Sequence, residues 1–187
     1  MSLPMKKQKV IAIAGMPGAG KGFVSDAASA RGIPVFVCGD VIREETARRG
    51  LPLTPENMGT VMLDIRQQEG PSVVAERLIP KLEASSSQIA IVEGVRSMAE
   101  VNALRRNHSV TIAAIHASPE TRYDRLLKRA RSDDPKSWEE FVGRDSRELG
   151  VGIGNVIALA QEMLVNEGSS EDFQAVSGRL ISKVAQK

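Results

Sequence analysis

The sequence is poor in cysteine, histidine and aromatic residues, and each shortage excludes a class of protein. Cys38 is the single cysteine among 187 residues, so no intrachain disulfide can form, and a reducing, cytoplasmic location is expected. The two histidines are isolated, and with one cysteine they offer neither zinc-ligand spacing nor a histidine-assisted nucleophile. Aromatic residues make up 3% of the chain, too few for a platform that stacks the bases of single-stranded nucleic acid.

The chain also lacks a strong net charge and a long apolar run. Its net charge is +2, so anion binding must come from local clusters rather than from the field of the whole molecule. No apolar run approaches the ~20 residues of a membrane span. The first apolar run leads into a glycine turn rather than a signal-peptide cleavage site. We therefore expect one cytoplasmic globular domain, without a signal peptide or a membrane partner.

The most informative stretch is the glycine-rich segment Val10–Gly22. Its apolar run, 10–14, predicts a buried strand that breaks into Gly15-x4-Gly20-Lys21 directly before a segment of helical character. Glycines let backbone N–H groups point inward, the next helix adds partial positive charge, and Lys21 can reach the β- and γ-phosphates of a nucleotide. The alternative is an ordinary strand-to-helix turn. The predicted phosphate loop comprises Gly15, Met16, Pro17, Gly18, Ala19, Gly20, Lys21, Gly22 and Phe23.

Strand and helix signals alternate along the rest of the chain, which predicts the α/β class. Further apolar strands are expected, with helices between them, at 35–38, 88–92, 110–115 and 163–165. Between Asp40 and Ser85 the alternation stops, and two or three consecutive helices are expected, an insertion suited to a mobile flap over a second substrate. The segment Gly150–Gly154 is expected to form a hinge-like loop before a helix over 155–161.

Capping residues mark where several of these helices begin. Thr54 precedes a proline at the first helical position, and Ser118 does the same. Ser97 and Ser137 are each followed three residues later by a glutamate, which is the capping-box spacing. These four positions predict helix N-termini.

Charged residues follow two of the predicted strands. Asp40 and Arg43 come after the strand at 35–38, and Glu93, Gly94 and Arg96 come after the strand at 88–92. Because the carboxyl ends of parallel strands face the ligand crevice, these side chains are candidates for a binding site. Asp40 also reads as a helix N-cap, a role that can coexist with function. Glu93 can hold Mg²⁺ through water, the alternative being a strand-end charge paired with a neighbour.

A basic hairpin follows the fourth strand. Its first helix, predicted to run to about Ala130, carries Arg122, Arg125, Lys128, Arg129 and Arg131. An acidic turn at 132–136 leads to a second helix, ending near Leu149, with Arg144 and Arg147. Five like charges in ten residues repel one another, and a polyphosphate would relieve that repulsion. The pattern favours a lid that closes arginines onto phosphates, and the alternative is a solvated charged hairpin.

Together these motifs resemble the adenylate kinase-like branch of the P-loop kinases over nearly the whole chain. The segment 15–22 is similar to the adenylate kinase loop, which also has glycine where other Walker A loops carry a Mg²⁺-binding serine or threonine, although that loop continues with threonine where this one has Phe23. The segment 39–43 resembles the monophosphate-binding segment, and 93–96 resembles the Asp-Gly-Phe-Pro-Arg signature with one residue fewer. The segment 165–169 is more like dephospho-coenzyme A kinases. The whole chain most resembles archaeal proteins described as related to adenylate kinase or dephospho-coenzyme A kinase.

The resemblance implies a three-layer α/β/α P-loop NTPase fold with a five-stranded parallel sheet of order 2-3-1-4-5. It divides a single kinase domain into a core, a helical acceptor-binding region and a short lid. The core covers about 5–40, 86–118 and 150–187, the acceptor-binding region about 41–85, and the lid about 119–149.

The resemblance also implies a phosphotransferase that uses MgATP. Lys21, Arg129, Arg131 and Arg144 would act on the transferred phosphoryl group, and Arg125 would cover the adenine. The acceptor would lie against Asp40, Arg43, Glu93, Gly94 and Arg96, with Glu93 assisting Mg²⁺ through water. A nucleoside monophosphate acceptor needs no base, whereas an alcohol such as dephospho-coenzyme A would use Asp40 as general base. The third reading is an ATP-driven switch that acts on an RNA or protein partner.

Overall fold

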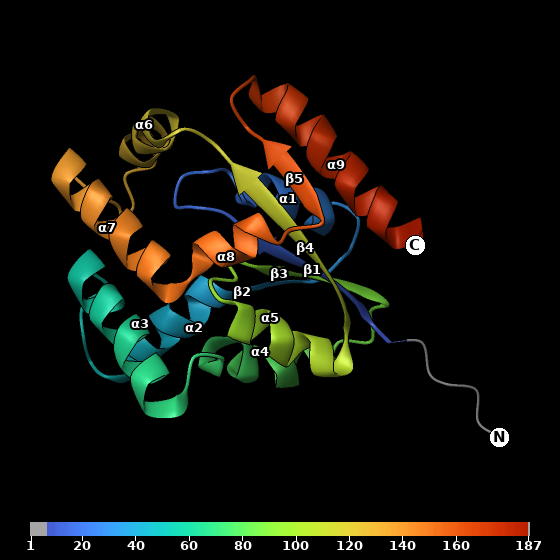
Figure 1. Ribbon diagram of the computed structural model, residues 1–187, viewed down its shortest axis with the longest axis horizontal. Helices are drawn as coiled ribbons and strands as arrows, with labels where there is room; N and C mark the ends of the chain where they lie inside the picture. Colours follow the sequence, from blue (N-terminus) through green and yellow to red (C-terminus); the bar gives the residue numbers. More distant parts are fainter. Residues whose placement is uncertain (1–6, 187) are drawn as a thin grey trace.

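A computed structural model describes residues 7–186 of the chain, so residues 5 and 6 of the predicted core, and residue 187, lie outside the described residues. Five parallel strands form one sheet in the order β2-β3-β1-β4-β5 (Figure 1), which confirms the predicted fold class and strand order. The strands are β1 (Lys9–Ala14), β2 (Val35–Val37), β3 (Ile89–Glu93), β4 (Ser109–His116) and β5 (Glu162–Val165).

Helices cover both faces of the sheet and extend past its carboxyl edge. They are α1 (Gly22–Ser29), α2 (Cys38–Arg48), α3 (Pro55–Glu69), α4 (Val73–Glu83), α5 (Met98–Asn107), α6 (Pro119–Arg129), α7 (Trp138–Val151), α8 (Ile153–Ala158) and α9 (Ser170–Gln186). Helices α1 and α9 cover one face, and α2, α4, α5 and α8 cover the other. Figure 1 shows α3, α6 and α7 beyond the carboxyl ends of the strands, where a ligand crevice is expected.

The central strand β1 carries the core on both of its faces. Ile11 and Ile13 pack with α1 and α9, whereas Val10 and Ala12 pack with the helices on the opposite face. All of these side chains are fully buried, which explains why this strand is continuously apolar rather than alternating. Ile13 lies opposite Glu93 in the β1–β3 register, so the end of β3 lies beside the start of the phosphate loop.

The predicted helix starts are confirmed at Thr54, Ser97, Ser118 and Ser137, whose hydroxyl oxygens each accept a bond from a backbone N–H three residues on. Ser97 and its glutamate form a complete capping box. At Ser137 the box is only half formed, because the Glu140 carboxylate accepts from the N–H of Lys136 instead. None of the helices over residues 7–186 combines the length and the hydropathy that a membrane crossing requires.

Two sequence-based predictions about the chain path are wrong. Strand β2 ends at Val37, so α2 begins at Cys38 and Asp40 lies inside its first turn rather than at the N-cap. The ladder stops there because Val37 lies opposite Glu93, the last residue of the one strand that β2 pairs with. The expected loop at 150–154 is a break of one residue at Gly152, where φ is 112°. Burial of Ile153 keeps the flanking residues helical, so α8 runs from 153 to 158 rather than from 155 to 161.

Candidate active site

The phosphate loop joins β1 to α1, and its glycines are required by backbone conformation and by close contacts. Gly18 and Gly20 have φ values of 83° and 97°, a region that favours glycine. A Cβ on Gly18 would lie 2.6 Å from the carbonyl oxygen of Arg122, and one on Gly20 would clash with Nδ2 of Asn166. The loop is therefore clamped between α6 and the segment after β5.

Lys21 folds back across the loop that it ends. Its Nζ donates to the carbonyl oxygens of Gly15 at 2.7 Å and Met16 at 3.3 Å. Burial lowers the pKa of Lys21 to about 8, and the nearby Glu93 carboxylate opposes that shift. A bound phosphate would supply the negative charge that this desolvated ammonium group lacks.

The residues after the lysine differ in their surroundings. Gly22 is exposed, and a Cβ built on it meets no atom within 4 Å. The ring of Phe23 packs edge-on against Phe173 of α9, with 5.6 Å between centroids, and also lines a cavity beside the loop. Phe23 therefore anchors α1 to α9 in addition to its predicted place in the nucleotide site.

Asn166, which the sequence analysis missed, connects the loop to the predicted adenine site. Its buried Nδ2 donates to the carbonyl oxygen of Ala19 at 2.9 Å, and its Oδ1 accepts from Nη2 of Arg125 at 3.3 Å. Nη1 of Arg125 is buried and has no hydrogen-bond partner within residues 7–186. Its position in the sequence could have identified it as a site residue, because Asn166 directly follows a strand at the carboxyl edge of the sheet.

Arg122 holds the loop from the outside and is not a phosphate ligand in this arrangement. Its Nη1 donates to the carbonyl oxygen of Pro17 at 3.1 Å, and its two terminal nitrogens pair with the Asp145 carboxylate at 2.9 and 2.6 Å. The guanidinium also lies 4.9 Å from the centre of the Phe141 ring. Arg122 thus joins α6, α7 and the phosphate loop.

Acids of the hairpin pair with Arg122, Arg129 and Arg144, which relieves part of the repulsion between the lid arginines. Whether a polyphosphate relieves the rest stays a prediction. Asp134 accepts two bonds from Arg129, while Arg144 donates to the backbone carbonyl of Asp133 at 2.9 Å and lies 3.4 Å from the Asp134 carboxylate. Burial alone would raise the pKa of Asp134, but its bonds with Arg129 and with the N–H of Arg131, together with the charges of Arg129 and Arg144, outweigh burial and the pKa is lowered. The Arg131 side chain has no hydrogen bond or ion pair to any residue of 7–186, and it lines the cleft beside the loop.

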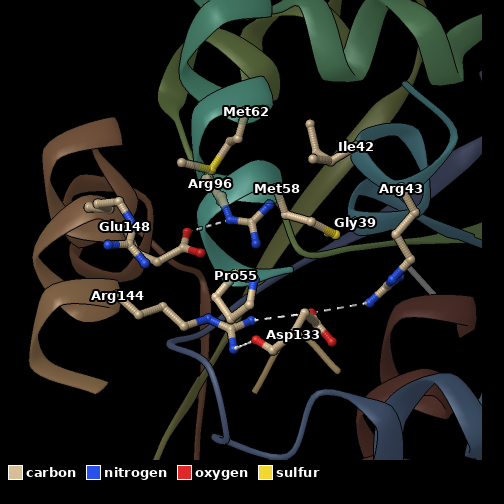
Figure 2. Close-up of a pocket in the computed structure, with 12 residues that line it drawn as sticks. Gly39, Ile42, Arg43, Pro55, Met58, Met62, Arg96, Asp133, Arg144 and Glu148 are labelled. Carbon is tan, nitrogen blue, oxygen red and sulfur yellow. Dashed lines mark hydrogen bonds and ion pairs between the residues drawn. The ribbon is translucent and has the colours of Figure 1, made fainter. Parts of the chain in front are cut away.

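A second cavity lies between the helical insertion and the lid (Figure 2). Four guanidinium groups and two carboxylates line it, which leaves two net positive charges, and apolar side chains form the remaining wall. The charged residues are Arg43, Arg96, Arg144, Arg147, Asp133 and Glu148, and the apolar ones are Ile42, Pro55, Met58 and Met62. Helices α2, α3 and α7 therefore meet around a cationic pocket with an apolar side.

Arg96 is paired inside this cavity with Glu148, a residue that the sequence analysis did not identify. Nε of Arg96 donates to Oε2 of Glu148, whose side chain is 5% exposed (Figure 2). Burial alone would raise the pKa of Glu148, but the charges of Arg96, Arg144 and Lys21 outweigh it and the pKa is lowered. An anionic acceptor would compete with this carboxylate for Arg96. Nothing in the local sequence marks the pair, because its members lie 52 positions apart.

Asp40 and Arg43 lie in the same cleft, where their side chains form an ion pair with each other. Nη1 of Arg43 lies 2.5 Å from Oδ1 of Asp40, whose side chain is 56% exposed. Nη2 of Arg43 is 3.9 Å from the Asp133 carboxylate across the second cavity. Arg147, which was noted on the hairpin but not assigned to the site, reaches from α7 to α3, where a Cβ on Gly59 would lie 3.3 Å from its Nε.

One continuous cleft contains most of the predicted site. It is lined by Pro17, Gly18, Lys21, Gly22, Asp40, Arg43, Glu93, Gly94, Arg96, Arg129, Arg131 and Arg144. A neighbouring hollow adds Gly20, Phe23 and Arg125. Gly15, Met16 and Ala19 line neither. The carbonyls of Gly15 and Met16 accept from Lys21 within the loop, and the carbonyl of Ala19 accepts from Asn166.

The residues at the head of the loop fit a metal ion that arrives with a nucleotide. No group of three or more His, Cys, Asp or Glu side chains between residues 7 and 186 could hold an ion without other ligands. Glu93 ends β3 beside the loop, and its Oε2 accepts a bond from the Ser25 hydroxyl. Gly94, with φ of 87°, turns the chain away immediately afterwards. A carboxylate and a hydroxyl here suit Mg²⁺ that is bound mostly by phosphates and water.

Comparison with known proteins agrees with this geometry. A family model described as AAA domain matches residues 14–142. A UPF0200 protein of Hyperthermus butylicus is 49% identical over 94% of this chain and 94% of its own, and one of Pyrococcus horikoshii is 47% identical over 94% and 97%.

Two solved kinases have the same fold at low sequence identity. Shikimate kinase from Acinetobacter baumannii, in complex with shikimate, has a TM-score of 0.60 at 13% identity and covers 97% of this chain and 94% of its own. A gluconokinase from Sinorhizobium meliloti has a TM-score of 0.55 at 15% identity, covering 97% and 95%. The predicted relationship to archaeal proteins is confirmed, and the fold is the one that these kinases have. The chain belongs to the AAA domain family through residues 14–142 and, over 94% of its length, to the UPF0200 family.

Proposed function

We propose that the protein is an ATP-dependent phosphotransferase whose acceptor is a nucleotide, in the manner of a nucleoside monophosphate kinase. One observation carries the proposal. The cleft that contains Lys21 and the phosphate loop continues into a second cationic cavity, with Arg43, Arg96 and Arg144 lining both. A donor phosphate and an acceptor can therefore lie on either side of the same arginines.

The donor side supports ATP. The glycine loop presents backbone N–H groups at the N-terminus of α1, an arrangement that favours phosphate. Arg125 has a buried, unpartnered Nη1 next to Phe23, Asn166 and the loop, and it would cover the base. Mg²⁺ that arrives with the nucleotide would neutralise part of the phosphate charge.

The acceptor side supports an anion attached to an apolar body. The cavity's two net positive charges match a phosphate monoester, which carries about two negative charges at neutral pH. Met58, Met62 and Pro55 form a wall against which a nucleobase can pack. A nucleoside monophosphate combines both features.

Catalysis would consist of positioning and charge stabilisation. An oxygen of the acceptor phosphate forms a bond to the γ-phosphorus while the bond from that phosphorus to the β–γ bridging oxygen breaks, and ADP leaves. Lys21 and Arg131 are placed to meet the charge on the transferred group, and Arg129 and Arg144 lie beside them. Because the acceptor phosphate is already ionised, no general base is required.

A second candidate is phosphorylation of a small hydroxylated acid or another alcohol. It is favoured by Asp40, which lines the cleft near Glu93 and can accept a hydroxyl proton once it leaves Arg43. The two solved kinases described above are named for shikimate and gluconate, which are acceptors of this type. The ion pair with Arg43 and the exposure of Asp40 make it the weaker candidate.

An acceptor screen tests both proposals. The protein is incubated with Mg²⁺ and ATP labelled in its γ-phosphate, together with nucleoside monophosphates, dephospho-coenzyme A and hydroxylated acids, and products are identified by mass spectrometry. We expect label in a nucleoside diphosphate. Label in an alcohol would favour the second candidate, and ATP binding without transfer to any acceptor would favour a nucleotide-driven switch.

Substitution of Asp40 separates the two chemistries. For an alcohol acceptor, Asp40→Asn should lower kcat by ~10²–10⁴-fold, because proton removal is lost. For a phosphate acceptor, we expect a change of less than about tenfold, because no proton is transferred. Glu44→Gln is the matched control, since Glu44 lies on the same helix, is exposed and is ion-paired with Lys81 at 3.1 Å.

A further inference from the structure

The loop lacks the hydroxyl that usually follows the lysine of a Walker A motif. Gly22 occupies that position at the first residue of α1, and a Cβ there would meet no atom within 4 Å. The space in which a serine or threonine side chain would lie is therefore open. A P-loop protein with this geometry needs another group to orient the metal that accompanies the nucleotide.

Ser25 lies one helical turn further along α1, on the same face as Gly22. Residues three apart on a helix are neighbours on its surface. The Ser25 side chain is 9% exposed, and its Oγ donates to Oε2 of Glu93 at the end of β3. Glu93 lines the cleft together with Lys21 and Gly22, so the hydroxyl and the carboxylate face the head of the loop.

We propose that Ser25 and Glu93 together hold a water molecule of the Mg²⁺ that binds with the nucleotide, and so replace the missing hydroxyl at position 22. The inference rests on the proposed use of MgATP. Ser25 lies three residues beyond Gly22, a rise of about 4.5 Å along the helix. One Mg²⁺–oxygen bond and one hydrogen bond between oxygens together span about 5 Å. A hydroxyl one turn below position 22 therefore reaches the ion through one coordinated water.

The hydrogen bonding of Ser25 suits this role. A hydroxyl has one proton to donate and two lone pairs that accept. Its proton goes to Glu93, so the lone pairs remain available for a water O–H. Mg²⁺ gives up its water reluctantly and keeps several of its own when bound to phosphates, so a protein contact to a coordinated water is the expected form of recognition.

The test measures how strongly the metal assists nucleotide binding, without requiring turnover. The Kd of ADP is measured by calorimetry in EDTA and in Mg²⁺, and the ratio of the two values is the metal-linked gain in affinity. Loss of an outer-shell partner weakens metal binding by about 10–100-fold in other proteins. In Ser25→Ala we expect this gain to fall by about 10-fold, with the Kd in EDTA unchanged. Ser29→Ala, an exposed serine on the same helix, is the matched control and should behave as the wild type.

Restoring the hydroxyl at its usual position makes the test specific. Because the space around Gly22 is open, Gly22→Thr can be accommodated. In the Ser25→Ala background, we expect Gly22→Thr to recover most of the metal-linked gain. Thermal unfolding of each variant establishes that the effects do not arise from loss of the fold.

Two results would overturn the role of Ser25 while leaving the phosphotransferase proposal intact. They are an unchanged metal-linked gain in Ser25→Ala, and a reduced gain that Gly22→Thr does not recover. Metal-assisted ADP binding that depends on Ser25, without phosphorylation of any acceptor, would support the site and contradict the phosphotransferase. A wild-type protein that binds ADP equally well in EDTA and in Mg²⁺ would contradict the Ser25 proposal directly.

Discussion

The phosphate loop and the acceptor cavity are built in different ways, although they share one cleft. The loop is shaped by backbone conformation, with two glycines at positive φ and a lysine bound to loop carbonyls six and five positions before it. The cavity is shaped by ion pairs between distant segments, such as Arg96 with Glu148. The backbone path of the loop is thus set mainly by consecutive residues, with Arg122 and Asn166 holding it from outside, whereas the cavity exists only after α2, α3 and α7 have packed.

The loop and the cavity also differ in whether their cationic side chains already have acidic partners. Most lid and cavity arginines already have acidic partners, so an acceptor must displace a carboxylate to reach them. Lys21 and Arg131 are the exceptions among the predicted phosphate ligands in residues 7–186, because neither has a carboxylate within ion-pairing distance. This contrast separates residues whose charges are available to a phosphate from residues whose charges hold the cleft together.

The largest expected effect comes from Arg131. Arg131→Met should lower kcat by about a hundredfold or more, equivalent to about 3 kcal/mol, because a guanidinium that meets transition-state charge is removed. The melting temperature should not change, since the side chain has no partner to lose. Steady-state kinetics and thermal unfolding measure the two quantities. Arg105→Met, an exposed arginine of α5, is the control. A normal kcat would remove Arg131 from the site.

Next in size is a substitution that breaks the loop's backbone geometry. Gly20→Ala forces a side chain into a positive-φ position and towards Asn166, so we expect a loss of about 2 kcal/mol in the free energy of unfolding. Nucleotide affinity should fall at least tenfold. Chemical denaturation and calorimetry with ADP measure these changes. Gly22→Ala, in open space in the same loop, should alter neither by much. Equal behaviour of the two variants would contradict a backbone-shaped site.

A smaller effect is expected where an ion pair occupies the acceptor cavity. Glu148→Gln removes the charge that competes for Arg96, so a nucleoside monophosphate should bind about tenfold more tightly. The free protein should be less stable by about 1–2 kcal/mol, because Arg96 loses its charged partner. Calorimetry with AMP and chemical denaturation test both expectations. Glu139→Gln, exposed on the same helix, is the control. Weaker AMP binding would mean that Glu148 contacts the acceptor itself.

The smallest expected effect is a pH dependence that comes from Lys21. Burial holds the pKa of Lys21 at about 8, below the 10.5 of a lysine in water. As the pH rises through 8 the free protein loses this positive charge, so the Kd of ADP should rise about fourfold between pH 7 and 8.5. Between pH 8 and 10.5 the free energy of unfolding should rise with pH, because the unfolded chain binds a proton that the folded protein has lost. Lys21→Met should show a flatter profile of Kd against pH.

The fold and the donor loop were predictable because their signals are local. Apolar runs located all five strands to within about two residues, and the caps at Thr54, Ser97 and Ser118 began helices as predicted. The errors occurred where packing overrides local preference. Asp40 was predicted as an N-cap but lies inside α2, because β2 ends where its neighbour β3 ends. A loop of five residues was predicted at 150–154, but Gly152 alone redirects the chain.

The partners of the charged side chains were not predictable, since an ion pair depends on two segments meeting. The hairpin sequence showed the arginines but not that Asp145 and Asp134 would pair with three of them. Arg147 and Ser25 gave no sequence signal beyond their residue type. Their neighbours, Gly59 and Glu93, lie 88 and 68 positions away.

The local patterns of the sequence were sufficient to predict a parallel α/β sheet and a phosphate loop at the end of its first strand. They also predicted charged residues at the ends of the next strands. Strand periodicity, glycine conformation and helix capping each depend on a few consecutive residues, so they can be read before folding. Contacts across the packed layers decide the rest. They determine which arginines have no acidic partner, which carboxylate lines the second cavity, and which hydroxyl faces the end of β3. Charge pairing acts over a few ångströms in space rather than along the chain, and the arrangement of α2, α3 and α7 around the sheet sets those distances.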